Sequence, residues 1–153
     1  MNDLELKVPP PVVALVLAVA MWAVSRFTLV FEVDAALRVP VAAAIALAGG
    51  AFSAAGVAAF RRAETTLNPM KPDAASSLVT GGIYRVTRNP MYVGLLLVLL
   101  AWAAFLCAPW ALIGPAVFVA YMNRFQIAPE ERALLSMFGD GYSAYRAKVR
   151  RWL

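Results

Sequence analysis

The chain has 153 residues, of which 62% are hydrophobic and only 15% are charged, with a formal net charge of +5. Soluble domains are usually about half apolar and a quarter charged, so this composition indicates an integral membrane protein. The absence of histidine removes the commonest metal ligand and general base, and we predict no metal site. The basic residues flank apolar blocks, so nucleic-acid binding is not expected.

The first apolar block, residues 8–31, predicts a membrane-spanning helix, because roughly 20 apolar helical residues cross the bilayer core. A cleaved signal peptide is the alternative. Its apolar stretch would be shorter, and its leading segment would not carry acidic residues such as Asp3 and Glu5. We therefore expect a retained span.

The second block, residues 39–60, predicts a span built mainly from small side chains. Small residues recur at every fourth position: Ala42, Ala46, Gly50, Ala54 and Ala58. Such a stripe lets membrane helices approach closely, so we expect it to pack inside the bundle. It would suit a dimer equally well, and the oligomeric state stays open.

Residues 91–107 and 110–125 predict two further, short spans. Only Ala108 and Pro109 separate them, which favours a tight helical hairpin. A single long helix is the alternative, but Pro109 and the later Gly114-Pro115 pair count against it.

The polar tail, residues 126–153, predicts a helical segment outside the bilayer core. Pro129 followed by Glu130 and Glu131 is typical of a helix start, since proline fits the first turn and acids favour the positive end of the dipole. Gly139 is expected to interrupt this helix. The basic stretch after it predicts a helix at the level of the lipid headgroups.

The distribution of basic residues predicts the orientation. All but two of the 14 lysines and arginines lie in the N-terminal tail, in residues 61–89, or from Arg124 onward. An even number of spans places these regions on one side, which the positive-inside tendency makes the cytoplasm. We therefore predict an all-α fold: a single membrane domain over residues 1–153, with about four transmembrane helices, cytoplasmic termini, and a site formed by residues 61–89 and 126–153.

Two polar clusters could carry chemistry: one precedes the third span and the other follows the fourth. Capping, headgroup anchoring and an aromatic belt would explain each cluster structurally. An unpaired charge at the edge of a bilayer is costly, however, so Glu130 or Glu131 is expected to pair with Arg88 or Arg124. The same charges would suit a ligand that carries both an ammonium and a carboxylate group.

Two separated runs of the sequence resemble a known membrane family. The first begins at Thr65 and ends with Arg88-Asn89-Pro90-Met91-Tyr92-Val93-Gly94. The second contains Glu130-Glu131, Phe138-Gly139, Tyr142, Tyr145, Val149 and Arg150. Over about residues 64–151 the chain resembles the isoprenylcysteine carboxyl methyltransferase and phospholipid methyltransferase family, small membrane enzymes that use S-adenosylmethionine.

The resemblance implies a set of site residues. The segment that helps enclose the methyl donor falls on Tyr84, Arg88, Asn89, Pro90, Tyr92 and Gly94. The paired acids implicated in holding the donor's amino group, or in activity, fall on Glu130 and Glu131. Arg124 matches an arginine of some relatives, and Glu131 and Arg124 are the catalytic candidates. Many members have histidine where this chain has Asn89, a change that leans away from an isoprenylcysteine substrate.

The implied reaction is an in-line methyl transfer that needs no metal, where orientation alone can supply ~7–11 kcal/mol. An amine acceptor must lose a proton, and Glu131 is the candidate to receive it. The resemblance implies S-adenosylmethionine entering from the cytoplasm and a lipidic or small apolar acceptor, surrounded by membrane lipids. The alanine-rich composition favours a bacterial inner membrane. A non-enzymatic module that binds lipid or a partner protein, and a membrane reductase, remain the alternatives.

Overall fold

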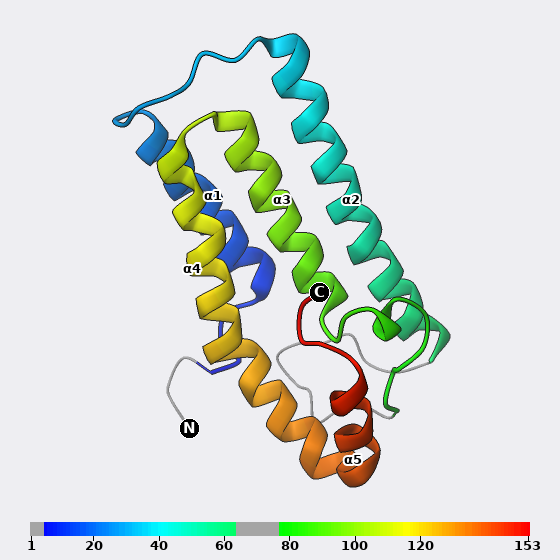
Figure 1. Cartoon of the computed structure of the whole chain (residues 1–153). Helices are drawn as coiled ribbons and strands as arrows, with labels where there is room; N and C mark the ends of the chain where they lie inside the picture. The colour runs from blue at the N-terminus through cyan, green and yellow to red at the C-terminus, as the bar shows by residue number, and fades with distance from the viewer. Residues whose placement is uncertain (1–4, 64–76) are drawn as a thin grey trace.

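The computed structural model describes residues 5–63 and 77–153, so the resemblance run that begins at Thr65 lies partly outside the described residues. All regular structure in these two stretches is helical, which confirms the all-α class. The α-helices of these stretches are α1 (Pro10–Ser25), α2 (Ala35–Arg62), α3 (Pro90–Leu106), α4 (Ile113–Tyr121) and α5 (Ala128–Lys148). Figure 1 shows α1 to α4 side by side as a bundle, with α5 beyond one end of it. Three short elements are the 3-10 helices η2 (Gly82–Arg85) and η3 (Pro109–Leu112) and the π-helix η4 (Met122–Ile127).

The four helices of the bundle correspond to the four predicted spans. Among the helices of the described stretches, α2 alone, at 28 residues, is long and apolar enough to cross a membrane by length and composition. The apolar helices α1 and α3 have 16 and 17 residues. The first span was expected to continue to residue 31, but α1 ends at Ser25. Helix α2 begins earlier than expected because the Asp34 carboxylate accepts a hydrogen bond from the backbone N–H of Ala36 and caps it.

The expected stripe of small residues at every fourth position of α2 is wrong, because the buried small residues recur at every seventh position. The residues of α2 that are buried are Ala42, Gly49 and Gly56, whereas Gly50 and Ala54 are exposed. A helix has 3.6 residues per turn, so a four-residue repeat drifts around it by about 40° per step and a seven-residue repeat by only about 20°. The seven-residue spacing therefore stays on the face that packs against α3.

The turn between α3 and α4 forms the predicted hairpin. Helix α3 ends at Leu106, and the next residue, Cys107, adopts the left-handed conformation with φ of 51°. Ala108 and Pro109 then lead into η3 and α4. The core lies between α1, α3 and α4, where Phe118 and Leu99 are fully buried.

Helix α5 starts at Ala128, with Pro129, Glu130 and Glu131 in its first turn, as the sequence predicted. Helix α4 continues into it through η4 without a break. Proline within a helix lacks the N–H that would bond to the carbonyl four residues earlier, here that of Phe125. The backbone N–H of Leu6 donates to that carbonyl instead, with an N···O distance of 3.1 Å. The N-terminal segment thus supplies the hydrogen bond that Pro129 cannot make.

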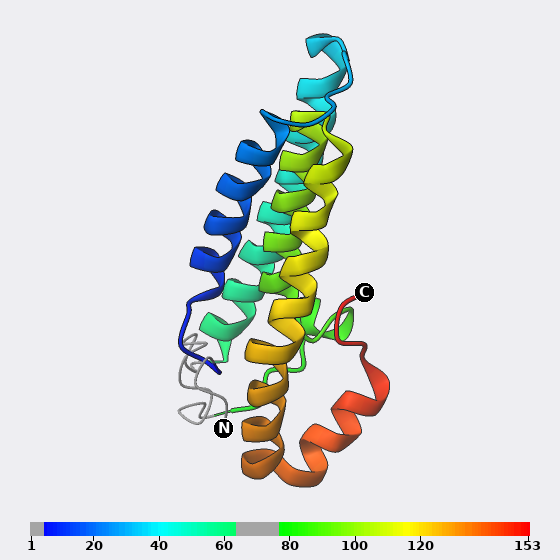
Figure 2. The ribbon, with the colours of Figure 1, turned by 90° about the vertical axis from the view of Figure 1, so that its left-hand side faces the viewer.

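The three basic regions meet at one end of the molecule, as predicted. Figures 1 and 2 place the N-terminal segment, the end of α2 and the whole of α5 at the same end of the bundle. Glu5 joins two of these regions, since its carboxylate forms ion pairs with Arg124 at 3.0 Å and Arg132 at 2.6 Å.

Candidate functional site

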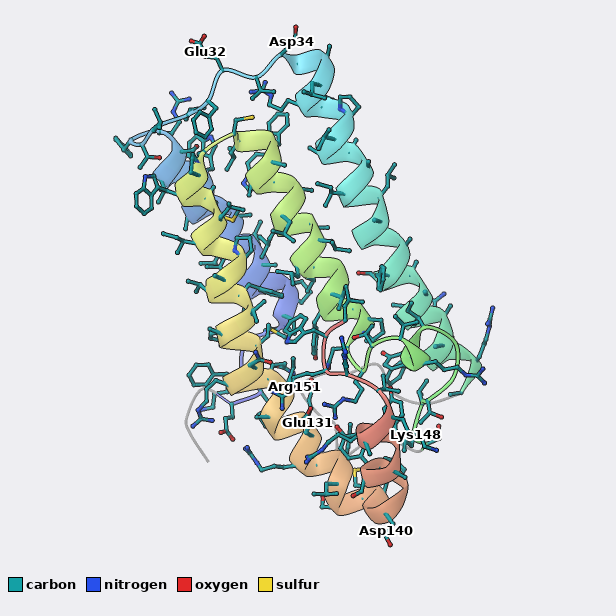
Figure 3. All side chains as sticks on the ribbon, in the orientation of Figure 1. Glu32, Asp34, Glu131, Asp140, Lys148 and Arg151 are labelled. Carbon is teal, nitrogen blue, oxygen red and sulfur yellow. The ribbon has the colours of Figure 1, made fainter. Side chains whose placement is uncertain are left out.

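A cluster of charged side chains lies where α3 begins and α5 starts. Both Glu131 oxygens are engaged: Arg88 Nη2 lies 3.1 Å from Oε1, and Arg151 donates from Nε at 3.0 Å and from Nη2 at 2.7 Å. The Arg88 and Glu131 side chains are only 10% and 11% exposed. Figure 3 shows the Glu131 and Arg151 side chains next to each other below the bundle. Of the pairings left open by the sequence (Glu130 or Glu131 with Arg88 or Arg124), the structure forms that of Glu131 with Arg88.

The C-terminal residues dock across the start of α3. Arg88 donates its backbone N–H to the Arg150 carbonyl at 3.0 Å, and the Asn89 side-chain amide donates to the Arg151 carbonyl at 2.8 Å. Helix α5 ends at Lys148, so Arg151 does not lie in the basic helix expected there. This docking explains why Asn89, at the N-cap position of α3, makes no side-chain capping bond.

Gly139 interrupts α5, as the sequence predicted, and the second half of the helix turns back toward the cluster. The φ of 49° and ψ of −121° at Gly139 interrupt the helix, and Figure 2 shows the second half of α5 turning toward the bundle. Arg88 Nη1 then donates to the Tyr142 hydroxyl at 3.4 Å, and the Tyr145 hydroxyl donates to the Tyr84 carbonyl at 2.7 Å. Burial raises the pKa of Tyr145 above its usual range, so this phenol remains a donor.

We expect Gly139→Ala to destabilise the fold by roughly 1–3 kcal/mol, because a side chain rarely adopts this backbone conformation. A Cβ at residue 139 would meet no atom within 4 Å, so the cost comes from the backbone alone. Thermal unfolding in detergent measures it. Gly141→Ala is the matched control, since its Cβ also meets nothing and its helical conformation favours alanine. Equal effects of the two substitutions would contradict the prediction.

Glu130 lies beside the cluster with different partners. Its Oε1 accepts hydrogen bonds from the Tyr92 hydroxyl and from Gln126 Nε2, both at 2.5 Å. Burial raises the pKa of Glu130 to about 7, against the effect of these two bonds, which lower it. Gln126 and Glu130 lie four residues apart and therefore on the same side of the helix. The site thus holds one carboxylate bridged by guanidinium groups and one carboxyl group that titrates near neutral pH.

Two predicted site residues lie away from the cluster. Arg124 is 52% exposed, pairs with Glu5 and rests on the Phe125 ring, with 5.6 Å from Cζ to the ring centroid. Gly94 is buried against α2, and a Cβ on it would lie 2.0 Å from Ser53 Oγ. Neither residue contacts the Arg88–Glu131–Arg151 cluster.

The other predicted residues surround the start of α3. Tyr84 is buried, with its ring 5.5 Å from that of Phe60 in an edge-on contact. Pro90 is the buried first residue of α3, and Tyr92 lies two residues further and donates to Glu130.

Three residues of the site were not predicted: Arg151, Tyr142 as a partner of Arg88, and Gln126. The sequence did contain a signal for Arg151. A nearly buried carboxylate requires its lone pairs to be satisfied, and one arginine rarely satisfies them all. The Arg150-Arg151 pair supplies a second guanidinium group, but only the reversal of α5 brings it to Glu131.

The site contains one unsatisfied donor. Arg88 Nε is buried and has no hydrogen-bond partner in the part of the chain that the structure describes. Leaving a buried donor unpaired costs about 1–3 kcal/mol, so the position favours a ligand that can accept this bond. Together with two carboxyl groups and a second guanidinium group, it complements a ligand with a carboxylate and an ammonium group.

Comparison with known proteins identifies the family to which the chain belongs. Residues 37–141 match the family model described as phospholipid methyltransferase, a match that covers both Arg88 and Glu131. The chain therefore belongs to the isoprenylcysteine and phospholipid methyltransferase family, as the motifs indicated. No solved structure gives a significant match.

Individual relatives agree with this assignment. The chain is 52% identical over 63 residues to an uncharacterised protein of Haemophilus influenzae, covering 41% of this chain and all of that protein. It is 34% identical over 73 residues to a protein-S-isoprenylcysteine O-methyltransferase of Xenopus laevis, covering 48% of this chain and 25% of that enzyme. It is 33% identical over 88 residues to protein-S-isoprenylcysteine O-methyltransferase B of Arabidopsis thaliana, covering 58% of this chain and 45% of that enzyme. The chain thus spans less than half the length of each of these two enzymes.

Proposed function

We propose that this chain is a membrane methyltransferase that transfers a methyl group from S-adenosylmethionine to a lipidic or small apolar acceptor at the cytoplasmic face. The observation that carries the proposal is the Arg88–Glu131–Arg151 cluster. Arg88 belongs to the first sequence run that resembles the family and Glu131 to the second, 43 positions later. The cluster brings the two runs together at one end of an apolar bundle. The two named relatives are protein-S-isoprenylcysteine O-methyltransferases, which supports an acceptor of this kind.

The proposed donor site uses charges that the cluster already holds. Arg88, with its unpaired Nε, would bind the donor's carboxylate, and the carboxylate of Glu131 would face its ammonium group. Charge-assisted hydrogen bonds of this kind are stronger than neutral ones and fix orientation. When bound, S-adenosylmethionine supplies an electrophilic methyl group. The chain's task is then to orient the acceptor in line with that methyl.

Glu130 is better placed than Glu131 to accept a proton from an amine acceptor. Both oxygens of Glu131 already accept bonds from guanidinium groups, whereas Glu130 is bound by neutral donors. With its pKa near 7, Glu130 is partly deprotonated at neutral pH and can still hold the proton that it receives. Tyr92 and Gln126 would hold the carboxyl group in place. A carboxylate or thiolate acceptor would need no such step.

The surface of the bundle supports placement in a membrane. Helices α1 and α2 expose large apolar side chains, including Leu15, Val16, Val19 and Leu47. So many exposed large apolar side chains on these helices are typical of membrane contact. The basic regions at the site end then favour the cytoplasmic side for both termini. We propose a multi-pass protein of the bacterial inner membrane that forms a single domain.

Calorimetric titration of S-adenosylmethionine, and then of S-adenosylhomocysteine, into the detergent-purified protein tests the proposal. Saturable binding in the micromolar range is the expected result. Absence of binding heat and of thermal stabilisation with both ligands would refute it and leave a non-enzymatic lipid- or partner-binding module as the better explanation.

The pKa of Glu130 leads to a pH-dependent prediction. Between about pH 4.5 and 7, the folded protein retains the Glu130 proton and the unfolded chain releases it. The contribution of this proton to the free energy of unfolding is therefore fully present below pH 4.5. It is lost as the pH rises through 7, and the loss is on the order of 3 kcal/mol. Glu130→Gln should remove this loss. Unfolding free energies of both proteins at several pH values measure the difference, and parallel curves would disprove the assignment.

A further inference from the structure

A groove lies between α1 and α2, above α3 and away from the cluster. Helices α1 and α2 both pack on α3 but barely touch each other, which leaves a groove of about 580 Å³ between them. Its α2 wall is formed by small residues, among them Ala42, Ala43 and Ala46. The volume lies within the range of about 300–1,000 Å³ that is typical of ligand pockets.

The lining of the groove is apolar throughout. Trp102 on α3 carries the one side-chain hydrogen-bond donor of the lining, and its Nε1 donates to the Ala18 carbonyl at 3.0 Å. Leu99, Val98 and Phe105 of α3 contribute only hydrocarbon. Since no polar group of the lining requires a partner, the groove suits a hydrocarbon chain.

A cation lies at the end of the groove farthest from the cluster. Arg38 precedes Val39, a lining residue, and its Cζ lies 5.0 Å from the centroid of the Phe105 ring. Its Nε is buried with no hydrogen-bond partner, and no ion pair involves it, among residues 5–63 and 77–153. The nearby carboxylates of Glu32 and Asp34 point away from the bundle in Figure 3. The guanidinium group is therefore available to an anion.

We propose that this groove binds an anionic glycerophospholipid, with one acyl chain along α3 and the phosphate at Arg38. Guanidinium groups bind phosphate through two parallel hydrogen bonds, and a net negative lipid complements an unpaired cation better than a zwitterionic one does. The site lies at the opposite end of the bundle from Glu131, so this lipid is not the methyl acceptor. The inference depends on the proposed membrane placement but not on methyl transfer.

Thermal unfolding in detergent tests the proposal, with dioleoyl phosphatidylglycerol and dioleoyl phosphatidylcholine as probes. Phosphatidylglycerol should raise the melting temperature of the wild type more than phosphatidylcholine does. Arg38→Gln should weaken phosphatidylglycerol binding about tenfold and remove this preference. Ala43→Phe, which fills the groove from an exposed position, should weaken the binding of both lipids.

Arg26→Gln is the matched control, because Arg26 is exposed at the same end of the bundle and does not line the groove. Equal stabilisation by the two lipids, or equal loss in Arg26→Gln and Arg38→Gln, would overturn the proposal. So would a dimer in detergent that Ala43→Phe dissociates, since a second copy would then occupy the groove. A parallel titration of S-adenosylmethionine separates the two proposals, because Arg38→Gln should retain donor binding if the methyltransferase proposal holds.

Discussion

Glu131→Gln is expected to weaken binding of S-adenosylmethionine at least ~30-fold. The substitution removes the one carboxylate that Arg88 and Arg151 share, and both guanidinium groups then lose their charged partner. Losing one member of a buried, hydrogen-bonded charge pair at a binding site costs ~2–5 kcal/mol. Calorimetric titration of the detergent-purified variant measures the loss, and size-exclusion chromatography reports whether the protein is folded.

Asp140→Asn is the control for Glu131→Gln. Asp140 belongs to the same helix and loses the same charge, but it is exposed and points away from the bundle in Figure 3. It should bind the donor as the wild type does. Undiminished donor affinity in both Glu131→Gln and Arg88→Ala would exclude the cluster from the donor site.

Gly94→Ala is expected to destabilise the fold by at least ~3 kcal/mol, the upper end of the usual cost of overpacking. A Cβ at this position would lie 2.0 Å from Ser53 Oγ and 2.6 Å from the Gly49 carbonyl oxygen. The serine side chain can rotate, but the carbonyl belongs to the backbone of α2, so the two helices would have to separate. Thermal unfolding in detergent measures the effect.

Gly50→Ala provides the comparison for Gly94→Ala. Gly50 lies on the exposed face of α2, and a Cβ there would meet nothing within 4 Å. The substitution should be neutral or stabilise the helix by up to about 1 kcal/mol. If Gly94→Ala melts as the wild type does but no longer binds the donor, Gly94 encloses the donor, as the resemblance implied, and our packing explanation fails.

Local signals in the sequence predicted much of the fold. The apolar blocks correspond to α1, α2, α3 and α4, Pro90 begins α3, and Gly139 interrupts α5. These features depend on nearby residues: proline has a fixed φ, and glycine tolerates positive φ. An ion pair between one of the two acids and Arg88 or Arg124 was also predictable, because buried charges require partners.

The remaining features depend on contacts between distant segments. The helix stays continuous where Pro129 begins α5, and Leu6, more than a hundred positions earlier, donates its backbone N–H to the Phe125 carbonyl just before it. Arg151 reaches Glu131 only after α5 has reversed direction. Arg124 was expected near the site, but Glu5 holds it on the other side of the helix start. No local pattern identifies such partners.

The docking of Arg150 and Arg151 across the start of α3 sets an order of events during biosynthesis. The helices of the bundle precede these residues in the chain and can form before they are synthesised. Both of the Arg151 bonds to Glu131, and the Arg150 carbonyl bonded to Arg88, form only after the ribosome has added these two residues. A nascent chain that stalls before Arg151 therefore carries the bundle without half of the guanidinium partners of Glu131, and acquires its complete charge cluster only when synthesis passes that residue.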